Sequence, residues 1–207
     1  YQILMPARDY KRIRDNDEGP NTGGMGAVAS RALADTALME GIERDIVRPT
    51  VAGLRKDGLR YRGFLYFGLM LTPEGPQVLE YNCRFGDPET QPVMLRLQSD
   101  LSTLIEAAID GRLHATEARW DPRPALGVVM ASANYPGTPR TGDVIHGLDI
   151  DAPPDSKLFH AGTRLEEDQV LTSGGRVLGV TALGQGLQAA RDLAYEAAAK
   201  IQFEGAF

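Results

Sequence analysis

Apolar residues recur at helical spacing over residues 34–54, so that one side of this segment is hydrophobic and the other polar. Spacings of three and four place side chains on one face of an α-helix, which predicts a single amphipathic helix. Gly58 follows as a stop signal, and Pro49 should kink or break the helix because proline lacks an amide hydrogen and crowds the preceding turn. The face predicted to be buried consists of Leu38, Ile42, Ile46, Val47, Val51 and Leu54.

Short apolar runs predict strands in the first half of the chain. Residues 63–71 read GFLYFGLML, residues 72–76 supply turn chemistry, and residues 77–82 form a second run. We interpret them as a β-hairpin. Residues 1–5, YQILM, are also predicted to form a strand, and because it opens the chain without a leading loop we expect a portion of a longer protein.

Two further helices are predicted after the hairpin, at residues 91–97 and 101–109. Asp100 is the expected N-cap of the second helix, and Gly111 follows its end. The expected buried face of this second helix consists of Leu101, Leu104, Ile105 and Ala108.

The remainder of the chain alternates short strands with glycine and proline turns, and an alanine-rich helix at residues 187–201 should cover the resulting sheet. A polar, proline-containing stretch at residues 114–124 is the expected boundary, which divides the chain into domains 1–116 and 117–207. Together these elements predict an α+β protein. The strands are predicted at residues 126–133, 157–161, 169–172 and 176–183. The covering face of the last helix consists of Leu187, Ala190, Leu193, Ala194, Ala197 and Ile201.

Residues 7–30 follow neither the helical nor the strand period and are dense in Asp, Arg, Asn, Gly and Pro. We expect a loop, and structureless loops of this length in compact domains tend to be functional. Four glycines fall among the eight residues 19–26, GPNTGGMG, and glycine permits positive φ and close backbone approach to a ligand. The segment matches neither a Walker loop nor a dinucleotide fingerprint. From the residues alone, a phosphate cradle and a flexible turn or linker both stay open.

Composition limits the classes of function. The 207 residues are 43% hydrophobic and 24% charged, as in ordinary globular proteins, and the net charge of -6 argues against nucleic acid as a partner. No run of about 18 apolar residues is present, so no membrane partner is expected. The single cysteine, Cys83, cannot form a disulfide within the chain, and a cytoplasmic location is the expectation.

Glu80, Asn82 and Arg84 alternate along the end of the predicted hairpin. Since strand side chains alternate between faces, these three should project from one face, with Cys83 buried on the other. A carboxylate and an amide oxygen suit Mg²⁺, and a neighbouring guanidinium stabilises charge on a phosphoryl group. A solvated strand face would explain the same string. The polar loop FGDPETQ that follows directly favours the magnesium–nucleotide interpretation.

Seven motifs run through nearly the whole chain. They are DYKR at 9–12, DEGPNTGGMGA at 17–27, GFLYFGLM at 63–70, EYNCRFGDPETQ at 80–91, LGVVMA at 126–131, FHAGT at 159–163 and GGRVL at 174–178. Taken together they resemble the phosphoribosylamine–glycine ligase family of the ATP-grasp superfamily. The resemblance implies the carboxyl-terminal portion of such an enzyme: part of an ATP-grasp domain, followed by a small β-rich domain with a covering helix.

The activity that the resemblance implies is an ATP-dependent carbon–nitrogen ligase of de novo purine biosynthesis. Such an enzyme activates glycine as glycyl phosphate and joins it to 5-phosphoribosylamine, giving glycinamide ribonucleotide, ADP and phosphate. The resemblance implies Glu80 and Asn82 as ligands of Mg²⁺ or Mn²⁺, and Arg84 as the catalytic residue that balances charge on the transferring phosphate. ATP, glycine and phosphoribosylamine are the expected partners of a monomeric enzyme. The implied substrate-binding residues are Asp9, Lys11, Asn21, Thr22, Gly23, Gly24, Asp87, Pro88 and Glu89.

Two departures and two alternatives accompany this interpretation. Many ATP-grasp enzymes carry another acidic metal ligand on the preceding strand, but residues 63–72 contain no acid, so the metal shell is expected to be incomplete. The family's nucleotide-gripping residues precede the segment that this chain resembles, so the chain alone is expected to be inactive or nearly so. One alternative is a carboxylating or formate-using purine enzyme, which is not expected to combine GPNTGGMG with RFGDPETQ. The other is a noncatalytic nucleotide-binding module.

Overall fold

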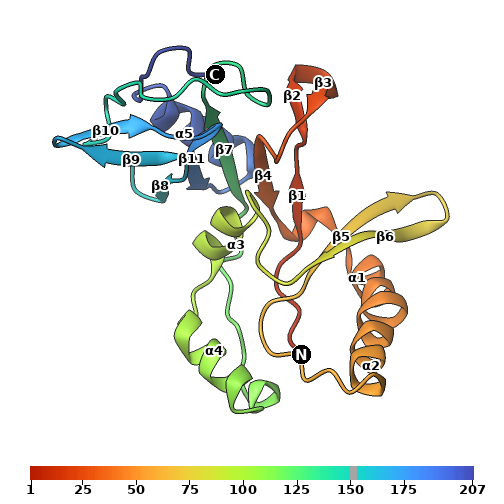
Figure 1. Ribbon diagram of the computed structural model, residues 1–207. Coiled ribbons are helices and arrows are strands. Elements are labelled where there is room, and N and C mark those ends of the chain that lie inside the picture. Colours follow the sequence, from red (N-terminus) through yellow and green to blue (C-terminus); the bar gives the residue numbers. More distant parts are fainter. Residues whose placement is uncertain (150–152) are drawn as a thin grey trace. The chain divides into compact units, whose positions relative to one another are not determined.

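The computed structural model describes residues 1–149 and 153–207, and the chain forms two compact units whose elements are labelled in Figure 1. The first unit consists of Tyr1–Pro6, Arg31–Gly86 and Leu97–Trp120. The second unit consists of Ala7–Ser30, Asp87–Arg96 and Asp121–Phe207. The units interleave along the sequence, so they differ from the predicted domains 1–116 and 117–207, which stay a prediction. No helix in the described part of the chain is both long enough and apolar enough to span a membrane.

The first unit contains the predicted long helix, which is confirmed but has an irregular middle. A 3₁₀ turn, Arg31–Leu33, precedes α1 (Thr36–Ile42), a π-helical turn (Glu43–Val47) and α2 (Arg48–Lys56). The widened turn lies just before Pro49, which supplies no amide hydrogen to the helix.

The long helix ends at Lys56, and Gly58 follows its end as predicted, with a φ of +74° that suits glycine. The Gly58 amide donates to the Arg55 carbonyl at 3.1 Å, and the Leu59 amide donates to the Leu54 carbonyl at 2.9 Å. These two bonds satisfy carbonyl groups at the helix end that have no partner within the helix.

The predicted β-hairpin is confirmed as β5 (Tyr66–Thr72) paired antiparallel with β6 (Gly75–Asn82) in the first unit. A β-bulge lies between Gly68 and Leu69. The hydroxyl groups of Thr50 and Tyr81 are 3.1 Å apart, which connects α2 to β6.

The predicted helix at residues 101–109 is confirmed as α4 (Leu101–Ile109), followed by a 3₁₀ turn at Leu113–Ala115. The Asp100 carboxylate caps α4 by accepting the Thr103 amide at 3.1 Å. The predicted buried face was wrong in part: Leu104 and Ala107 are the buried residues, whereas Ile105 is exposed.

The strand predicted at residues 1–5 is wrong, because the structure has no strand before β1 (Ala7–Asp9). An apolar segment becomes a strand only where a neighbouring backbone pairs with it. The prediction of a loop over residues 7–30 is also wrong. This segment forms β1, β2 (Arg12–Arg14), a 3₁₀ turn at Asp15–Asp17, β3 (Glu18–Asn21) and β4 (Gly26–Ala29).

A five-stranded antiparallel sheet in the order β1-β4-β7-β11-β8 forms the centre of the second unit. Strands β7 (Ala125–Ala131), β8 (Ser156–His160) and β11 (Arg176–Leu183) confirm three of the predicted strands. The fourth is confirmed as β10 (Gln169–Thr172), which pairs with β9 (Thr163–Glu166), a polar strand that the sequence did not indicate.

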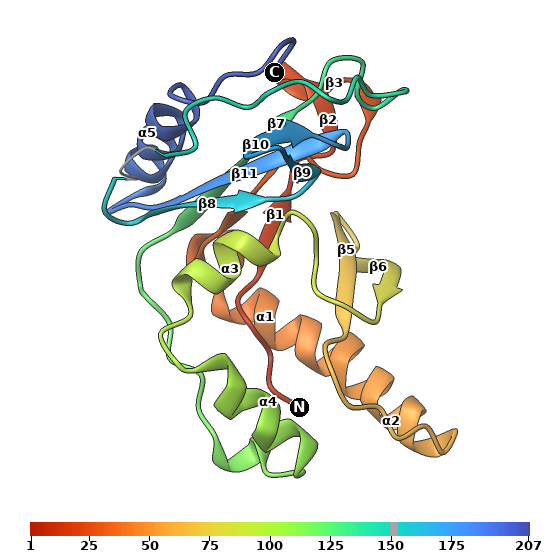
Figure 2. The ribbon, with the colours of Figure 1, turned by 60° about the vertical axis from the view of Figure 1, so that its left-hand side comes forward.

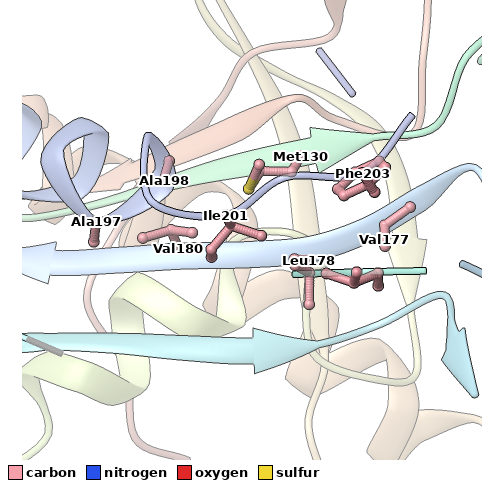
Figure 3. Close-up of a cluster of buried hydrophobic side chains, with 9 residues drawn as sticks. Met130, Val177, Leu178, Val180, Ala197, Ala198, Ile201 and Phe203 are labelled. Carbon is pink, nitrogen blue, oxygen red and sulfur yellow. The ribbon is translucent and has the colours of Figure 1, made fainter. Parts of the chain in front are cut away.

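Two helices cover the opposite faces of this sheet, as Figure 2 shows. Helix α3 (Thr90–Arg96), predicted at residues 91–97, packs on β4, β7 and β11. Helix α5 (Leu187–Ala198) packs on β7, β11 and β8 and confirms the predicted covering helix, although Leu187 is exposed. Between α5 and the sheet lies an apolar cluster that includes Met130, Val180, Ala197, Ile201 and Phe203 (Figure 3).

Candidate functional site

The predicted site residues fall into two groups, one in each compact unit. The predicted metal ligands Glu80 and Asn82 and the predicted catalytic Arg84 belong to the first unit. All of the predicted substrate-binding residues belong to the second unit. Each group is therefore described within its own unit.

Glu80 and Asn82 lie on one face of β6, because the Asn82 side-chain amide donates to Glu80 Oε1 at 3.0 Å. Gly68 of β5 pairs with Glu80, and a Cβ on this glycine would lie 2.8 Å from Glu80 Cγ. The missing side chain thus leaves room for the carboxylate to lie across the hairpin. Carboxylate and amide side chains offer the oxygen ligands that a hard divalent cation prefers, so the pair fits the predicted metal, whose binding here stays a prediction.

Arg84 lies beyond the end of β6, where its Nη1 donates to the Phe85 carbonyl at 2.8 Å and its side chain is exposed. Exposure leaves this guanidinium accessible to an anionic group. The expectation that Cys83 is buried on the opposite strand face is wrong, since Cys83 is exposed. A two-stranded hairpin has too little surface to bury both of its faces.

The second unit contains a cavity of about 430 Å³ on the sheet face that α3 covers. Asp87, Pro88 and Gln91 form one wall, and side chains and glycines of β7 and β11 form another. Among the described residues, the lining consists of Asp87, Pro88, Gln91, Gly127, Val129, Tyr135, Ala161, Gly162, Gly175, Arg176, Leu178, Gly179 and Thr181. A volume of this size accommodates a small organic molecule.

Arg176, at the start of β11, joins two loops beside this cavity. Its Nη1 donates to the Gly23 carbonyl at 2.9 Å and to the Asp87 carbonyl at 3.2 Å. Its Nη2 donates to Asp87 Oδ2 at 2.8 Å. The Tyr135 hydroxyl accepts the Gly23 amide at 2.8 Å. No role was predicted for Arg176 or Tyr135, although Arg176 belongs to the GGRVL motif at residues 174–178.

Close packing explains the glycines of the predicted phosphate cradle. A Cβ on Gly24, whose φ is +118°, would lie 2.4 Å from Pro88 Cδ and 2.6 Å from Asp9 Oδ1. The Thr22 hydroxyl donates to the Lys11 carbonyl at 2.8 Å and accepts the Gly24 amide at 2.9 Å. The glycine-rich loop is therefore held by specific contacts, which do not favour the alternative of a merely flexible linker.

Asp9 lies beneath the glycine-rich loop with its side chain 10% exposed, and it forms an ion pair with Lys11. Burial raises the pKa of the Asp9 carboxyl; the Lys11 hydrogen bond opposes this shift and the charge of Glu89 adds to it. Glu89 is also buried. The structure thus brings Asp9, Lys11, Glu89 and Gly24 into one region, whereas Asn21 is exposed where β3 pairs with β2.

Comparison with solved structures first defines the class of fold. The biotin carboxylase domain of the Hydrogenobacter thermophilus 2-oxoglutarate carboxylase is similar, with a TM-score of 0.65 at 13% identity over 96% of this chain and 42% of that chain. The phosphoribosylglycinamide synthetase ATP-grasp (A) domain matches residues 1–90, and the C domain of the same family matches residues 125–207. Residues 1–90 therefore belong to an ATP-grasp domain, and the predicted α+β class is confirmed.

Individual relatives identify the family. Phosphoribosylamine–glycine ligases of Allochromatium vinosum and Xanthomonas campestris are each 54% identical over 99% of this chain and 48% of their own length. The crystal structure of phosphoribosylamine–glycine ligase from Thermotoga maritima has a TM-score of 0.80 at 37% identity, over 98% of this chain and 50% of that one. The chain belongs to the phosphoribosylglycinamide synthetase family, as its motifs predicted. It spans about half the length of the curated relatives it matches.

Proposed function

We propose that this chain is part of an ATP-dependent ligase that joins glycine to 5-phosphoribosylamine through glycyl phosphate. The observation that carries the proposal is the convergence of the glycine-rich loop, the Asp87 loop and Arg176 beside one cavity in the second unit. Family membership supports it, since the relatives bear the name of this activity.

Phosphoribosylamine, in this proposal, occupies the cavity with its phosphate against the Arg176 guanidinium. Planar guanidinium groups bind phosphate oxygens through paired hydrogen bonds. Nη2 of this guanidinium donates to the Asp87 carboxylate, so phosphate binding would exchange one anionic partner for another. Asp87 would then be available to accept a hydrogen bond from the substrate amine.

Glycine carboxylate is a poor electrophile, and phosphorylation by ATP converts one carboxylate oxygen into part of a good leaving group. The amine nitrogen then forms a bond to the glycyl carbonyl carbon, inorganic phosphate leaves, and the amine loses a proton. Arg84 is proposed to balance charge on the transferring phosphoryl group. Glu80 and Asn82 are proposed to hold Mg²⁺ or Mn²⁺, which would neutralise phosphate oxygens of ATP when bound.

Acyl phosphates hydrolyse if water reaches them, so water must be excluded from the glycyl phosphate. The glycine-rich loop is proposed to exclude water, together with Asp87, Pro88 and Glu89. Its attachment through Thr22 supports a fixed position for this loop. A cytoplasmic, monomeric enzyme is proposed as well, in keeping with the single free cysteine, Cys83.

The test is ADP release by the product of the complete reading frame that encodes this chain. We expect release to require both glycine and phosphoribosylamine; a requirement for bicarbonate or formate instead would refute the proposal. Arg176→Ala should raise the KM for phosphoribosylamine by about tenfold or more, because a hydrogen bond to a charged group contributes about 1.5–3 kcal/mol. The matched control is Arg164→Ala on β9, where the guanidinium pairs with Glu166 at 2.9 Å.

A further inference from the structure

Two polar atoms in the wall of the second unit's cavity are buried without a hydrogen-bond partner in the described part of the chain. Thr181 of β11 is fully buried, and its Oγ1 has no such partner. Oε1 of Gln91, on α3, is likewise buried and unpaired. Both residues line the cavity beside Arg176 and Asp87.

Gly127 lies beside the buried Thr181 hydroxyl. A Cβ on this glycine would lie 3.1 Å from Thr181 Oγ1 and 3.5 Å from Pro92 Cδ, so any larger residue on β7 would fill the space next to the hydroxyl. The backbone of Gly127 does not need a glycine for conformational reasons, since it lies in regular strand with no positive φ. The absence of a side chain at Gly127 therefore leaves the space next to the Thr181 hydroxyl unfilled.

A buried hydroxyl without a partner destabilises a fold, and valine has the same shape and an equal preference for strands. Thr181 thus lowers the free energy of unfolding relative to a valine at the same position. Gln91 Oε1 can only accept a hydrogen bond, so its complement is a donor, and Thr181 Oγ1 can both donate and accept. Hydroxyl groups of a sugar meet both requirements, while the Arg176 guanidinium beside them suits a phosphate.

We infer that Thr181 and Gln91 are specificity-determining residues that bind sugar hydroxyl groups of a phosphorylated pentose in the cavity of the second unit. The inference rests on the proposed function, which places the phosphate of phosphoribosylamine at Arg176. It assigns the two parts of the ligand to different residues. Arg176 binds the phosphate, and the residues of α3 and β11 bind the sugar, so that the cavity binds a sugar phosphate more tightly than phosphate alone.

Calorimetric titration of the full chain with ribose 5-phosphate and with inorganic phosphate tests this division. We expect Thr181→Val to weaken ribose 5-phosphate binding by about tenfold, the effect of one lost hydrogen bond, and to leave inorganic phosphate binding unchanged. The same substitution should raise the melting temperature, because it removes an unpaired buried hydroxyl. Gln91→Met should also weaken binding of ribose 5-phosphate alone, and Gly127→Ala should do so while keeping the hydroxyl in place.

Thr172→Val is the matched control, because Thr172 is also fully buried but its hydroxyl accepts the Asp143 amide at 3.1 Å. It should lower the melting temperature and leave both affinities unchanged. Unchanged ribose 5-phosphate binding in Thr181→Val, or an equal loss for both probes, overturns the inference and leaves the proposed phosphate site standing. Failure of the unsubstituted chain to bind either probe overturns the proposed use of the cavity itself.

Discussion

Replacing Gly24 by alanine should destabilise the second unit through two separable effects. The backbone at Gly24 has a φ of +118°, a conformation that costs a residue with a Cβ about 1–3 kcal/mol. The new Cβ would also lie 2.4 Å from Pro88 Cδ and 2.6 Å from Asp9 Oδ1. Pro88 is buried and its ring cannot rotate away, so overpacking adds about 1–3 kcal/mol. The expected loss is about 2–6 kcal/mol, a large part of the stability of a typical domain.

Gly142→Ala is the matched control in the same unit. Its φ is +92°, and the nearest atom to a new Cβ is Arg164 Nη2 at 3.9 Å, so only the backbone effect of about 1–3 kcal/mol is expected. Urea unfolding followed by circular dichroism gives the free energies, and amide hydrogen exchange in β4 and β7 assigns the loss to the second unit. Equal losses in the two variants would refute the steric reasoning at Gly24.

Three further outcomes follow from charged groups. Burial holds the pKa of Asp9 above its unfolded value, so the stability contributed by the protonated carboxyl is lost as pH rises through the folded pKa. Asp9→Asn should therefore raise the free energy of unfolding at neutral pH and have little effect in acid. Urea titrations at both pH values measure this difference. The Arg123 hydrogen bond lowers the pKa of Asp121, so this pair stabilises the fold above the unfolded pKa, and that stabilisation is lost as pH falls through the folded pKa. Arg123→Met should lower the free energy of unfolding by about 1–3 kcal/mol at neutral pH and move acid unfolding to a higher pH. If Glu80 holds the metal as proposed, Glu80→Gln should raise the Mn²⁺ concentration that gives half-maximal ligase activity by about tenfold or more, because even residues that only contact a metal ligand change metal affinity by that factor. Glu74→Gln, in the hairpin turn, should leave this concentration unchanged.

The sequence predicted elements that have a clear local signal. The long helix was confirmed because its apolar positions recur at helical spacing, and the β5–β6 hairpin and strand β11 were confirmed because they are apolar runs bounded by turn residues. Strand β4 was missed since its four residues, GAVA, are small and buried throughout, which leaves no alternation to detect. Its strand character comes from pairing with β7, where Gly26 is opposite Val128. Pairing between segments so far apart in sequence has no local signal.

The residues of the candidate site were likewise predicted only in part. Gly24 and Asp87 were predicted as substrate-binding residues, whereas Arg176 belongs to the GGRVL motif but was assigned no role. Its two partners lie 153 and 89 positions away, so only the fold reveals that its guanidinium joins them. Thr181 had even less signal, because a threonine in an apolar strand is an ordinary residue until its hydroxyl is found unpaired beside a cavity.

The glycine-rich loop shows why the family motifs were nevertheless sufficient to predict the region of the site. Flexibility alone would let many sequences serve in place of GPNTGGMG, but the structure requires a glycine at position 24. Gly24 faces Pro88 and Asp9 with no room for a side chain, and a Cβ on Gly23 would lie 2.9 Å from Arg176 Cζ and displace the end of that side chain. Three motifs that are distant in sequence, those containing Gly23, Pro88 and Arg176, therefore constrain one another through contact. These three motifs are among the seven whose joint occurrence carried the resemblance to the family, and the structure brings them into contact.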